Sequence, residues 1–320
     1  MSQNVLPKER QRLLDDPYRS SLERLMAREQ DASGDAAPEP AASSMPLVSV
    51  IVTTRNNHQT LDACLASIMR QTYEAIELIV VDRDSSDGTK LIARYYTDQV
   101  YNHGPERSAQ RNFGVRKAHG EFVVIIDSDM ELTRNVISDC VDVFYYHEDT
   151  SGVIIPEESF GVGFWARCKR LERSFYRGND WLEAPRFFRK DVYEETGGYD
   201  ETMVSGEDWD LGARVRQCGR VARINAHINH NEGRLHLIKS LRKKYYYAGQ
   251  ARVYLRKNPL SSSLSQNVGP LRRYRLFFSQ PGKLFSNPIA GIGMLLMKTF
   301  EFSFGALGYL LSGLKKRESA

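Results

Sequence analysis

The sequence lacks the features that define several common classes of protein. Its 320 residues include only four cysteines, and their spacing matches neither a disulfide framework nor a metal knuckle, so we expect free thiols in a reducing, cytosolic compartment. The basic first 25 residues contain no apolar run, so we expect no secretory signal. Hydrophobic residues make up 41% and charged residues 26% of the chain, which argues against both wholesale disorder and a polytopic membrane protein.

Acidic residues are absent from one long stretch near the end of the chain. From residue 233 to residue 300 there is no Asp or Glu, whereas the same stretch contains thirteen Lys and Arg residues. Residues 1–232 have an excess of acidic side chains, so the net charge of +4 hides two regions of opposite sign. A surface with so many unopposed cations attracts a polyanion, either nucleic acid or an anionic bilayer.

Residues 287–314, which follow the basic stretch, carry almost no charge. Lys298 and Glu301 are the two charged residues there, and in one spanning helix both would lie near the bilayer centre, at about 2.5–3.5 kcal/mol each. We therefore expect helices that lie in the membrane interface, or a shallow hairpin. The alternative is a buried core helix in which these two side chains pair at i,i+3 spacing.

The chain divides into three regions by composition. Residues 1–45 combine a charged segment of helical composition with a linker rich in Ala, Ser, Pro and Asp, which cannot pack a core. Residues 46–232 have the alternating pattern of an α/β domain. Residues 233–320 form a basic and apolar helical region that we expect to associate with a membrane.

The central region alternates between strand-like and helix-like segments. The apolar spacing of residues 61–68 indicates a helix, as does the pattern of residues 89–97 and 108–119. This order predicts a parallel, Rossmann-like sheet with flanking helices and right-handed crossovers, which binds ligands at the carboxyl ends of its strands. The strand-like runs, rich in Val and Ile, are residues 47–54, 76–82 and 121–127.

Aspartates gather where these strands end. Turn formation and helix capping explain Asp84 and Asp87. They explain Asp127 and Asp129 less well, because two carboxylates one residue apart at the end of a buried strand repel each other unless a cation or a donor lies between them. A divalent ion such as Mg²⁺ or Mn²⁺, bridging these oxygens and a substrate diphosphate, would relieve the repulsion.

Four motifs in this order resemble those of the family 2 glycosyltransferases with a GT-A fold, over roughly residues 47–232. They are LVSVIVTTRNN, SIMRQTYEAIELIVVDRDSSDGT, ERSAQRNFGVRKAHGEFVVIIDSDMEL and GGYDETMVSGEDWDLGARVRQCG. The resemblance implies an inverting transfer of a sugar from a nucleotide-diphosphate donor, with a metal ion held by the Asp-x-Asp motif.

The resemblance also implies roles for residues within these motifs. Asp127 and Asp129 would face ribose and metal, with Asp129 as the direct metal ligand. His230 is placed like the histidines that complete the metal or diphosphate site near the end of GT-A domains, and a surface or core role is the alternative. The residues implied to bind the nucleotide are Thr53, Thr54 and Arg55 beside it, Asp82 at the base or ribose, and Arg111 near the phosphates.

Inversion by a single displacement requires a base that takes the proton of the acceptor hydroxyl, opposite the leaving nucleotide. The GEDWD segment supplies Glu207, Asp208 and Asp210 at the start of a helix, where capping is the alternative role. By resemblance, Asp208 is the base and Glu207 binds or orients the acceptor, while Asp210 caps the helix or pairs with an arginine. Further candidates on the acceptor side are Trp209, Arg186 and Arg189.

These observations predict a metal-dependent glycosyltransferase that moves a sugar from a nucleotide-diphosphate donor to a lipid-linked acceptor based on polyprenyl phosphate or diphosphate. We expect it to act in glycan or cell-surface polysaccharide synthesis, as a peripheral or monotopic protein at the cytoplasmic face of the membrane. The alternative is a non-catalytic nucleotide-binding protein whose basic, tyrosine-containing tail binds nucleic acid. We expect no nucleic-acid partner, because the tail continues into a segment too apolar for a solvated arm.

Overall fold

The computed structural model describes residues 45–257 and 269–314, with side chains for residues 45–249 and 269–312. The helical segment and linker expected before Met45 lie outside this part of the chain. The described residues from Pro46 onward make one compact unit. The boundary expected at residue 232 falls inside a strand, β10 (Ile228–Arg234).

A seven-stranded sheet forms the centre of this unit, in the order β3-β2-β1-β4-β8-β6-β9. Strands β1 to β4 are parallel, as the sequence predicts, whereas β8 is antiparallel to both of its neighbours. The register pairs Thr54 with Asp82 and Thr53 with Asp127, so the polar ends of three strands meet at one edge. The strands are β1 (Val48–Thr54), β2 (Ile76–Asp82), β3 (Val100–Asn102), β4 (Phe122–Asp127), β6 (Thr150–Ile154), β8 (Phe187–Arg189) and β9 (Arg220–Arg223).

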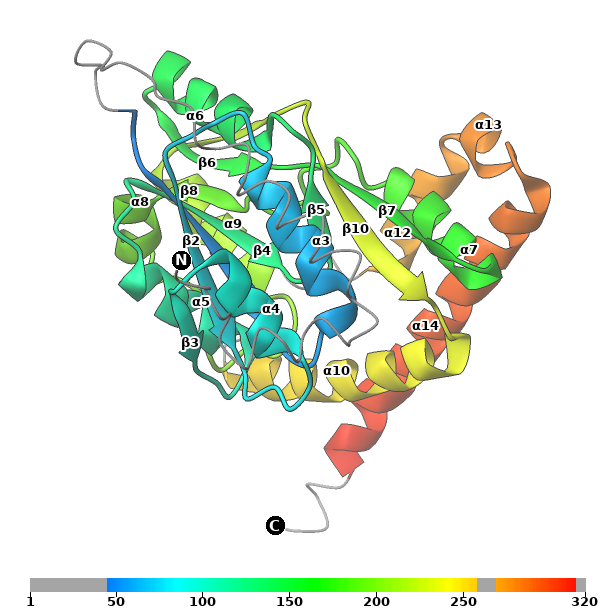
Figure 1. Cartoon of the computed structure of the whole chain (residues 1–320). Helices are drawn as coiled ribbons and strands as arrows, with labels where there is room; N and C mark the ends of the chain where they lie inside the picture. Colours follow the sequence, from blue (N-terminus) through cyan, green and yellow to red (C-terminus); the bar gives the residue numbers. More distant parts are fainter. Residues whose placement is uncertain (1–44, 258–268, 315–320) are drawn as a thin grey trace, which may run out of the picture. The chain divides into compact units, whose positions relative to one another are not determined.

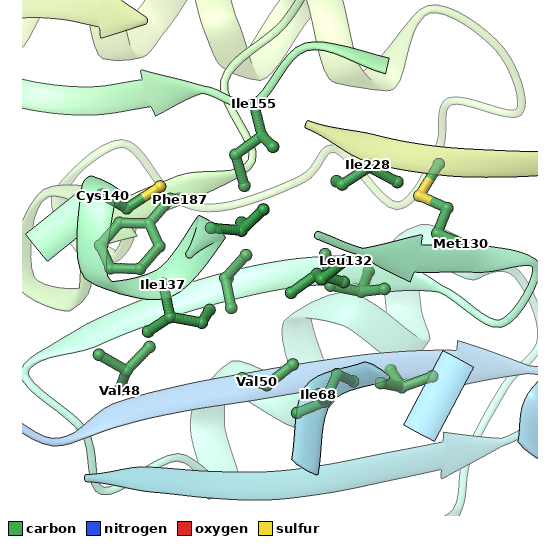
Figure 2. Packing of buried hydrophobic residues seen from close by; sticks show 14 of the residues in the cluster. Val48, Val50, Ile68, Met130, Leu132, Ile137, Cys140, Ile155, Phe187 and Ile228 are labelled. Carbon is green, nitrogen blue, oxygen red and sulfur yellow. The ribbon is translucent and has the colours of Figure 1, made fainter. Parts of the chain in front are cut away.

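Helices cover both faces of this sheet, which is why β1 is buried along its whole length (Figure 1). Val48 and Val50 pack with one set of helices, α3, α4 and α6, in the core shown in Figure 2, whereas Ile51 packs with the other set, α5, α8 and α9. The helices are α3 (His58–Met69), α4 (Thr89–Tyr96), α5 (Arg107–Lys117), α6 (Val136–Tyr146), α8 (Lys190–Glu195) and α9 (Glu207–Cys218). The three helices predicted among the first strands are confirmed. Asp87 accepts a hydrogen bond from the backbone N–H of Thr89, which is the turn role expected from the sequence, whereas the N-cap position of α4 is Gly88.

A second, three-stranded sheet in the order β5-β10-β7 continues from the carboxyl end of β4. It contains β5 (Met130–Leu132) and β7 (Glu157–Val162), with β10 between them. β10 pairs His230 with Met130 on one side and with Ser159 on the other. The second sheet therefore brings His230 beside Asp129, and Glu157 into the same region.

The C-terminal helices pack on α7 (Phe164–Ser174) and add a third core to the unit, with Cys168, Phe277, Met294 and Met297 fully buried. α14 lies alongside both α10 and α7. Its glycines allow this approach, because a Cβ atom on Gly308 would lie 2.2 Å from the Tyr245 carbonyl oxygen. The helices are α10 (Leu237–Lys257), α12 (Pro270–Phe278), α13 (Pro281–Leu284) and α14 (Pro288–Leu314).

α14 is one continuous helix, so the expectation of a shallow hairpin is wrong. Lys298 and Glu301 lie on its buried side, 4% and 3% exposed, and their side chains pair at 2.9 Å. This is the pairing of the core-helix alternative. Residues 288–312 are also long and apolar enough to cross a membrane by length and composition. The outer side of the helix exposes apolar side chains in a stripe with helical spacing, Ile289, Ile292, Leu296, Phe300, Phe304, Leu307 and Leu311.

Candidate active site

A cavity of about 810 Å³ opens where the parallel strands end. Its wall is formed by the ends of β1 and β4, by β7 and β10, by the start of α9, and by α7 and α10. Parallel α/β sheets bind ligands at this edge. The site residues that the sequence predicts and that line the cavity are Thr53, Thr54, Arg55, Asp127, Asp129, Glu207, Asp208 and His230.

Asp82 and Arg111, the other two residues predicted to bind the nucleotide, do not line this cavity. Asp82 is 1% exposed and accepts hydrogen bonds from the backbone N–H of Ser85 at 2.7 Å and from its hydroxyl at 2.5 Å. It therefore holds the turn after β2. Thr54 does line the cavity, and its buried hydroxyl has no hydrogen-bond partner among the described residues, so it is available to a ligand.

The fully buried guanidinium of Arg111 links the two carboxylate groups of the site. It donates to Asp127 Oδ1 at 2.9 Å and to Asp208 Oδ1 at 3.0 Å, and its Nη1 lies 3.5 Å from Glu207 Oε1. The same guanidinium lies over the Tyr199 ring, 4.8 Å from the ring centroid. α5, which carries Arg111, thus fixes the end of β4 relative to the start of α9.

Two carboxyl groups of the site, Asp127 and Glu207, have pKa values that their surroundings shift in opposite directions. Burial alone would raise the pKa of Asp127, but the charges of Arg111, Arg186 and Arg107 outweigh it and hold that pKa well below its usual range. Burial and the neighbouring charge of Asp208 raise the pKa of Glu207. Asp127 is therefore firmly ionised, whereas Glu207 takes up a proton more readily than an ordinary glutamate.

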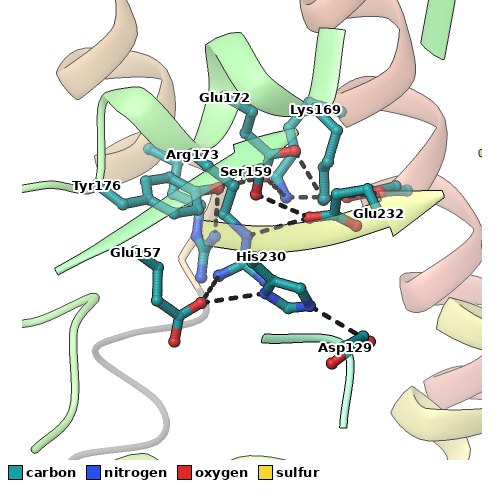
Figure 3. Close-up of polar contacts among 12 residues, drawn as sticks. Asp129, Glu157, Ser159, Lys169, Glu172, Arg173, Tyr176, His230 and Glu232 are labelled. Carbon is teal, nitrogen blue, oxygen red and sulfur yellow. Dashed lines mark hydrogen bonds and ion pairs between the residues drawn. The ribbon is translucent and has the colours of Figure 1, made fainter. Parts of the chain in front are cut away.

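A second polar group joins the end of β4 to the small sheet (Figure 3). His230 Nε2 lies 3.5 Å from Asp129 Oδ2, and His230 Nδ1 lies 3.2 Å from Glu157 Oε2. Burial lowers the pKa of His230, but these two carboxylates raise it to about 10. Glu157 in turn is paired with Arg186 at 2.8 Å. His230 is thus held as an imidazolium between two carboxylates.

The donor atoms needed for a divalent cation are partly present. Asp129 is 39% exposed at its side chain, and the His230 ring lies beside it, so one carboxylate and one imidazole meet at the cavity wall. Among the described residues, no group of three or more His, Cys, Asp or Glu side chains is arranged to hold a metal ion. This pair fits Mg²⁺ or Mn²⁺ when substrate oxygens supply further ligands and His230 gives up its extra proton.

The remaining candidates from the sequence differ in whether they line the cavity. Arg186 lines the cavity, as does Trp209, whose indole N–H donates to the Leu182 carbonyl oxygen at 3.2 Å. Arg189 is paired with Asp191 at 3.3 Å and does not line the cavity. Asp210 pairs with Arg214 at 2.7 Å, which is the pairing with an arginine expected as an alternative to capping.

Sequence reasoning missed one whole wall of the cavity. Glu157 is the first residue of β7 and lies three residues after the end of β6, so a polar residue just beyond the apolar run of residues 153–155 was the available signal. Lys169 and Arg173 point from α7, and Lys243 and Lys244 from α10. No sequence motif marks these four cations, because only the packing of α7 and α10 brings them to the cavity.

Comparisons with known proteins agree with this architecture. Residues 49–201 match the family described as Glycosyl transferase family 2. The chain is 36% identical over 104 residues to the GalNAc(5)-diNAcBac-PP-undecaprenol beta-1,3-glucosyltransferase of Campylobacter jejuni, which is 29% of this chain and 33% of that protein. It is 33% identical over 88 residues to the UDP-Glc:alpha-D-GlcNAc-diphosphoundecaprenol beta-1,3-glucosyltransferase WfgD of Escherichia coli, 26% of this chain and 35% of that protein. The matches thus span about a third of these relatives.

The solved structure of the mannosyltransferase PcManGT from Pyrobaculum calidifontis, in complex with GDP-Man and Mn²⁺, resembles this chain with a TM-score of 0.54. The likeness covers 91% of this chain and 94% of that one at 18% identity, so it shows a common fold of the GT-A type. The α/β unit with its strand-end cavity is a glycosyltransferase domain, and its residues 49–201 belong to glycosyltransferase family 2.

Proposed function

We propose that this protein is a metal-dependent, inverting glycosyltransferase. It takes a sugar from a nucleoside-diphosphate donor and transfers it to a lipid-linked acceptor of the polyprenyl phosphate or diphosphate type, at the cytoplasmic face of the membrane. The observation that carries the proposal is that one cavity holds Asp129 and His230 on one side and Asp208 on another. The names of the two undecaprenol-linked glucosyltransferases similar to this chain support the acceptor class and a role in glycan or cell-surface polysaccharide synthesis.

The donor would bind at the ends of β1 and β4. Thr53 and Thr54 supply hydroxyl groups there, and Arg55 supplies an exposed cation with no ion pair among the described residues. Thr53 also donates a hydrogen bond to Asp127 Oδ1 at 3.3 Å, which leaves Thr54 as the free hydroxyl. Hydroxyl groups, an arginine and carboxylates at a strand edge suit a nucleoside diphosphate.

Asp129 and His230 would hold a Mg²⁺ or Mn²⁺ ion together with the donor diphosphate. Such an ion, when bound, neutralises the charge that develops on the leaving diphosphate. Glu157 contacts the other ring nitrogen of His230, so it orients the ring in the way that carboxylates orient metal-binding histidines. Asp127 is ionised and anchored by Arg111, which fixes the start of the loop that carries Asp129.

Asp208 would act as the general base. In a single displacement, the acceptor oxygen forms a bond to the anomeric carbon, the bond from that carbon to the diphosphate oxygen breaks, and Asp208 takes the acceptor proton. Its side chain is 35% exposed at the cavity, and one of its oxygens is held by Arg111 at 3.0 Å. Holding one oxygen orients the carboxylate and leaves the other free for the acceptor.

The outer stripe of α14 supports the membrane location. Ile289, Ile292 and Leu296 are 72%, 55% and 50% exposed, an unusual concentration of large apolar side chains for a surface that faces water. The inner side of the same helix packs on α7 and α10 and buries Lys298. A helix with one apolar side exposed and one packed side suits attachment parallel to the membrane, as a monotopic protein.

Transfer can be tested directly with purified full-length protein. A panel of nucleoside-diphosphate sugars is incubated with undecaprenyl-diphosphate-linked acceptors in neutral detergent, with Mn²⁺, with Mg²⁺ or with excess EDTA. We expect a glycosylated lipid product with one donor, inverted at the anomeric carbon, and none in EDTA. Undiminished transfer in excess EDTA would exclude the metal dependence, and no transfer to any lipid-linked acceptor would exclude the acceptor class.

A further inference from the structure

The part of α10 with described side chains has three distinct sides. Ser240, Lys243, Lys244 and Tyr247, at i, i+3, i+4 and i+7 spacing, line the cavity. Tyr245, Ala248 and Gly249 contact α14 at Gly305 and Gly308, and their spacing defines a second side. The third side is exposed and contains Lys239, Arg242 and Tyr246. α10 thus connects the cavity to the helix with the apolar stripe.

The cavity side of α10 carries cations that have no carboxylate partner. Lys243 and Lys244 are exposed at the cavity wall, and neither makes an ion pair or a side-chain hydrogen bond with any described residue. Lys243 Nζ lies 5.7 Å from the Tyr247 ring centroid, which is its nearest recorded contact. α10 contains no acidic residue, so no carboxylate of its own helix balances either lysine.

Two more cations of the cavity wall lie on α7. Lys169 is already bound by Glu172 at 2.8 Å and by Glu301 at 3.4 Å (Figure 3). Arg173 lies 3.8 Å from Glu157 and 3.8 Å from Glu232, which are long contacts for an arginine. The carboxylates near Arg173 and Lys169 therefore balance these two side chains, whereas neither Lys243 nor Lys244 forms an ion pair with a described carboxylate. Burial and the charge of Lys169 lower the pKa of Lys244 to about 8, although the charges of Glu301 and Glu172 act in the opposite direction, so a bound anion would favour its charged form.

We propose that Lys243 and Lys244 form the subsite that binds the phosphate or diphosphate group of the acceptor. This inference rests on the proposed function. The chemical groups of such an acceptor occur in the order sugar hydroxyl, diphosphate and lipid, and the protein presents a matching order of Asp208, the α10 cations and the apolar stripe of α14. A diphosphate in this position neutralises both lysines and leaves the acceptor hydroxyl inside the cavity.

The diphosphate bound by these lysines could also belong to the nucleotide donor, so the test measures the affinity for each of the two ligands. The double variant Lys243→Gln/Lys244→Gln removes the two α10 cations of the cavity wall. The matched control, Lys239→Gln/Arg242→Gln, removes two charges from the exposed side of the same helix. Affinities are measured for farnesyl diphosphate and, with Mn²⁺, for UDP, GDP and dTDP. All measurements use full-length protein in neutral detergent without anionic lipid.

We expect the cavity double variant to bind farnesyl diphosphate about tenfold more weakly or worse, which corresponds to about 1.4 kcal/mol or more. Its affinity for the nucleoside diphosphate should change by less than about twofold, and the control pair should change neither affinity beyond that limit. A loss of nucleotide affinity in the cavity variant would assign the lysines to the donor and overturn the inference. Equal losses for both pairs would show unspecific attraction and also overturn it.

Transfer kinetics separate this inference from the proposed function. We expect the cavity double variant to raise the KM for a farnesyl-diphosphate-linked sugar acceptor by about tenfold, with kcat reduced less than KM is raised. An unchanged KM in a protein that transfers sugar would refute only the subsite. A wild-type protein that transfers no sugar to such acceptors and binds no nucleoside diphosphate would refute the proposed function itself.

Discussion

The guanidinium of Arg111 donates a hydrogen bond to Asp208 Oδ1 at 3.0 Å, although the two residues are 97 positions apart in the sequence. Arg111 is 0% exposed and Asp208 reaches the cavity, so the arginine supports the carboxylate from behind. The contact keeps the Asp208 carboxylate oriented toward the cavity, as a general base requires. The same guanidinium holds Asp127, so the metal side and the base side of the cavity share one anchor.

Removing the proposed base should affect turnover rather than donor binding. We expect Asp208→Asn to lower kcat by about 10²-fold or more, because a positioned base contributes at least that much, while the donor affinity stays near the wild-type value. Asp210→Asn is the matched control, since Asp210 lies on the same helix but pairs with Arg214 and does not line the cavity. Steady-state kinetics and nucleotide titration distinguish the two variants. A collapse of donor affinity in Asp208→Asn would assign this residue to donor binding.

Asp129 should be required for metal-dependent donor binding. We expect Asp129→Ala to abolish nucleotide-sugar binding in the presence of Mn²⁺, because it removes the exposed carboxylate beside His230. Calorimetry with and without Mn²⁺ measures the effect. Glu131→Ala serves as the control, because Glu131 lies two residues further along and does not line the cavity. Equal donor affinity in Asp129→Ala and wild type would remove Asp129 from the site.

The buried charges between α7 and α14 should stabilise the C-terminal helix only as a balanced set. Lys298 Nζ lies 2.5 Å from Glu172 Oε1 and 2.9 Å from Glu301 Oε2, and Lys169 supplies the second positive charge, 2.8 Å from Glu172. Lys298→Met leaves two carboxylates with one lysine, so we expect it to lower the free energy of unfolding by about 3 kcal/mol or more. The double variant Lys298→Met/Glu301→Leu restores the balance and should be less destabilised than the single variant. Chemical denaturation measures both, and additive losses would contradict this account.

The apolar stripe of α14 should make membrane attachment resistant to salt. We expect wild-type protein to remain on anionic vesicles at high ionic strength, because apolar burial is not screened. Replacing three residues of the stripe with glutamine should give a protein that high salt releases from the vesicles, since the basic residues then bind the membrane alone. The variant is Ile292→Gln, Leu296→Gln and Phe300→Gln. The control changes exposed apolar residues elsewhere, Met69→Gln, Leu91→Gln and Tyr145→Gln. Co-sedimentation at rising salt compares them, and equal release of variant and control would disprove the role of the stripe.

Glu77 should contribute stability that depends on pH. Burial raises its pKa, but hydrogen bonds from His119, Ser49 and Gln99 outweigh burial and lower the pKa from 4.5 to about 2. Because the folded-state pKa lies below the unfolded value, the carboxylate stabilises the fold above about pH 4.5, and this contribution is lost as the pH falls toward 2. Glu77→Gln should therefore be less stable than wild type at pH 7, with a smaller difference near pH 3. Urea midpoints measure this, with the exposed Glu74→Gln as the control.

The sequence by itself determined the first half of the sheet and most of the strand-end candidates. Val48, Val50 and Ile51 belong to an apolar run that suits a strand covered on both faces. The aspartates at the strand ends lie directly after such runs in the sequence. Parallel strands in register bring such ends to one edge whatever the rest of the chain does. The positions of Asp127 and Asp129 at the cavity could therefore be predicted before any side-chain packing was known.

Only the tertiary structure determined which buried side chains contact the strand-end residues and which side chains form the rest of the cavity wall. Arg111 was predicted near the phosphates, but burial under α9 places its guanidinium between Asp127 and Asp208. Lys298 belongs to a segment whose composition suits a membrane, and Glu172, 126 positions earlier, supplies the buried partner that allows one continuous helix. Lys243 became part of the cavity because α10 packs between that cavity and α14. Such contacts depend on which surfaces remain available after the core has formed, and local periodicity carries no information about them.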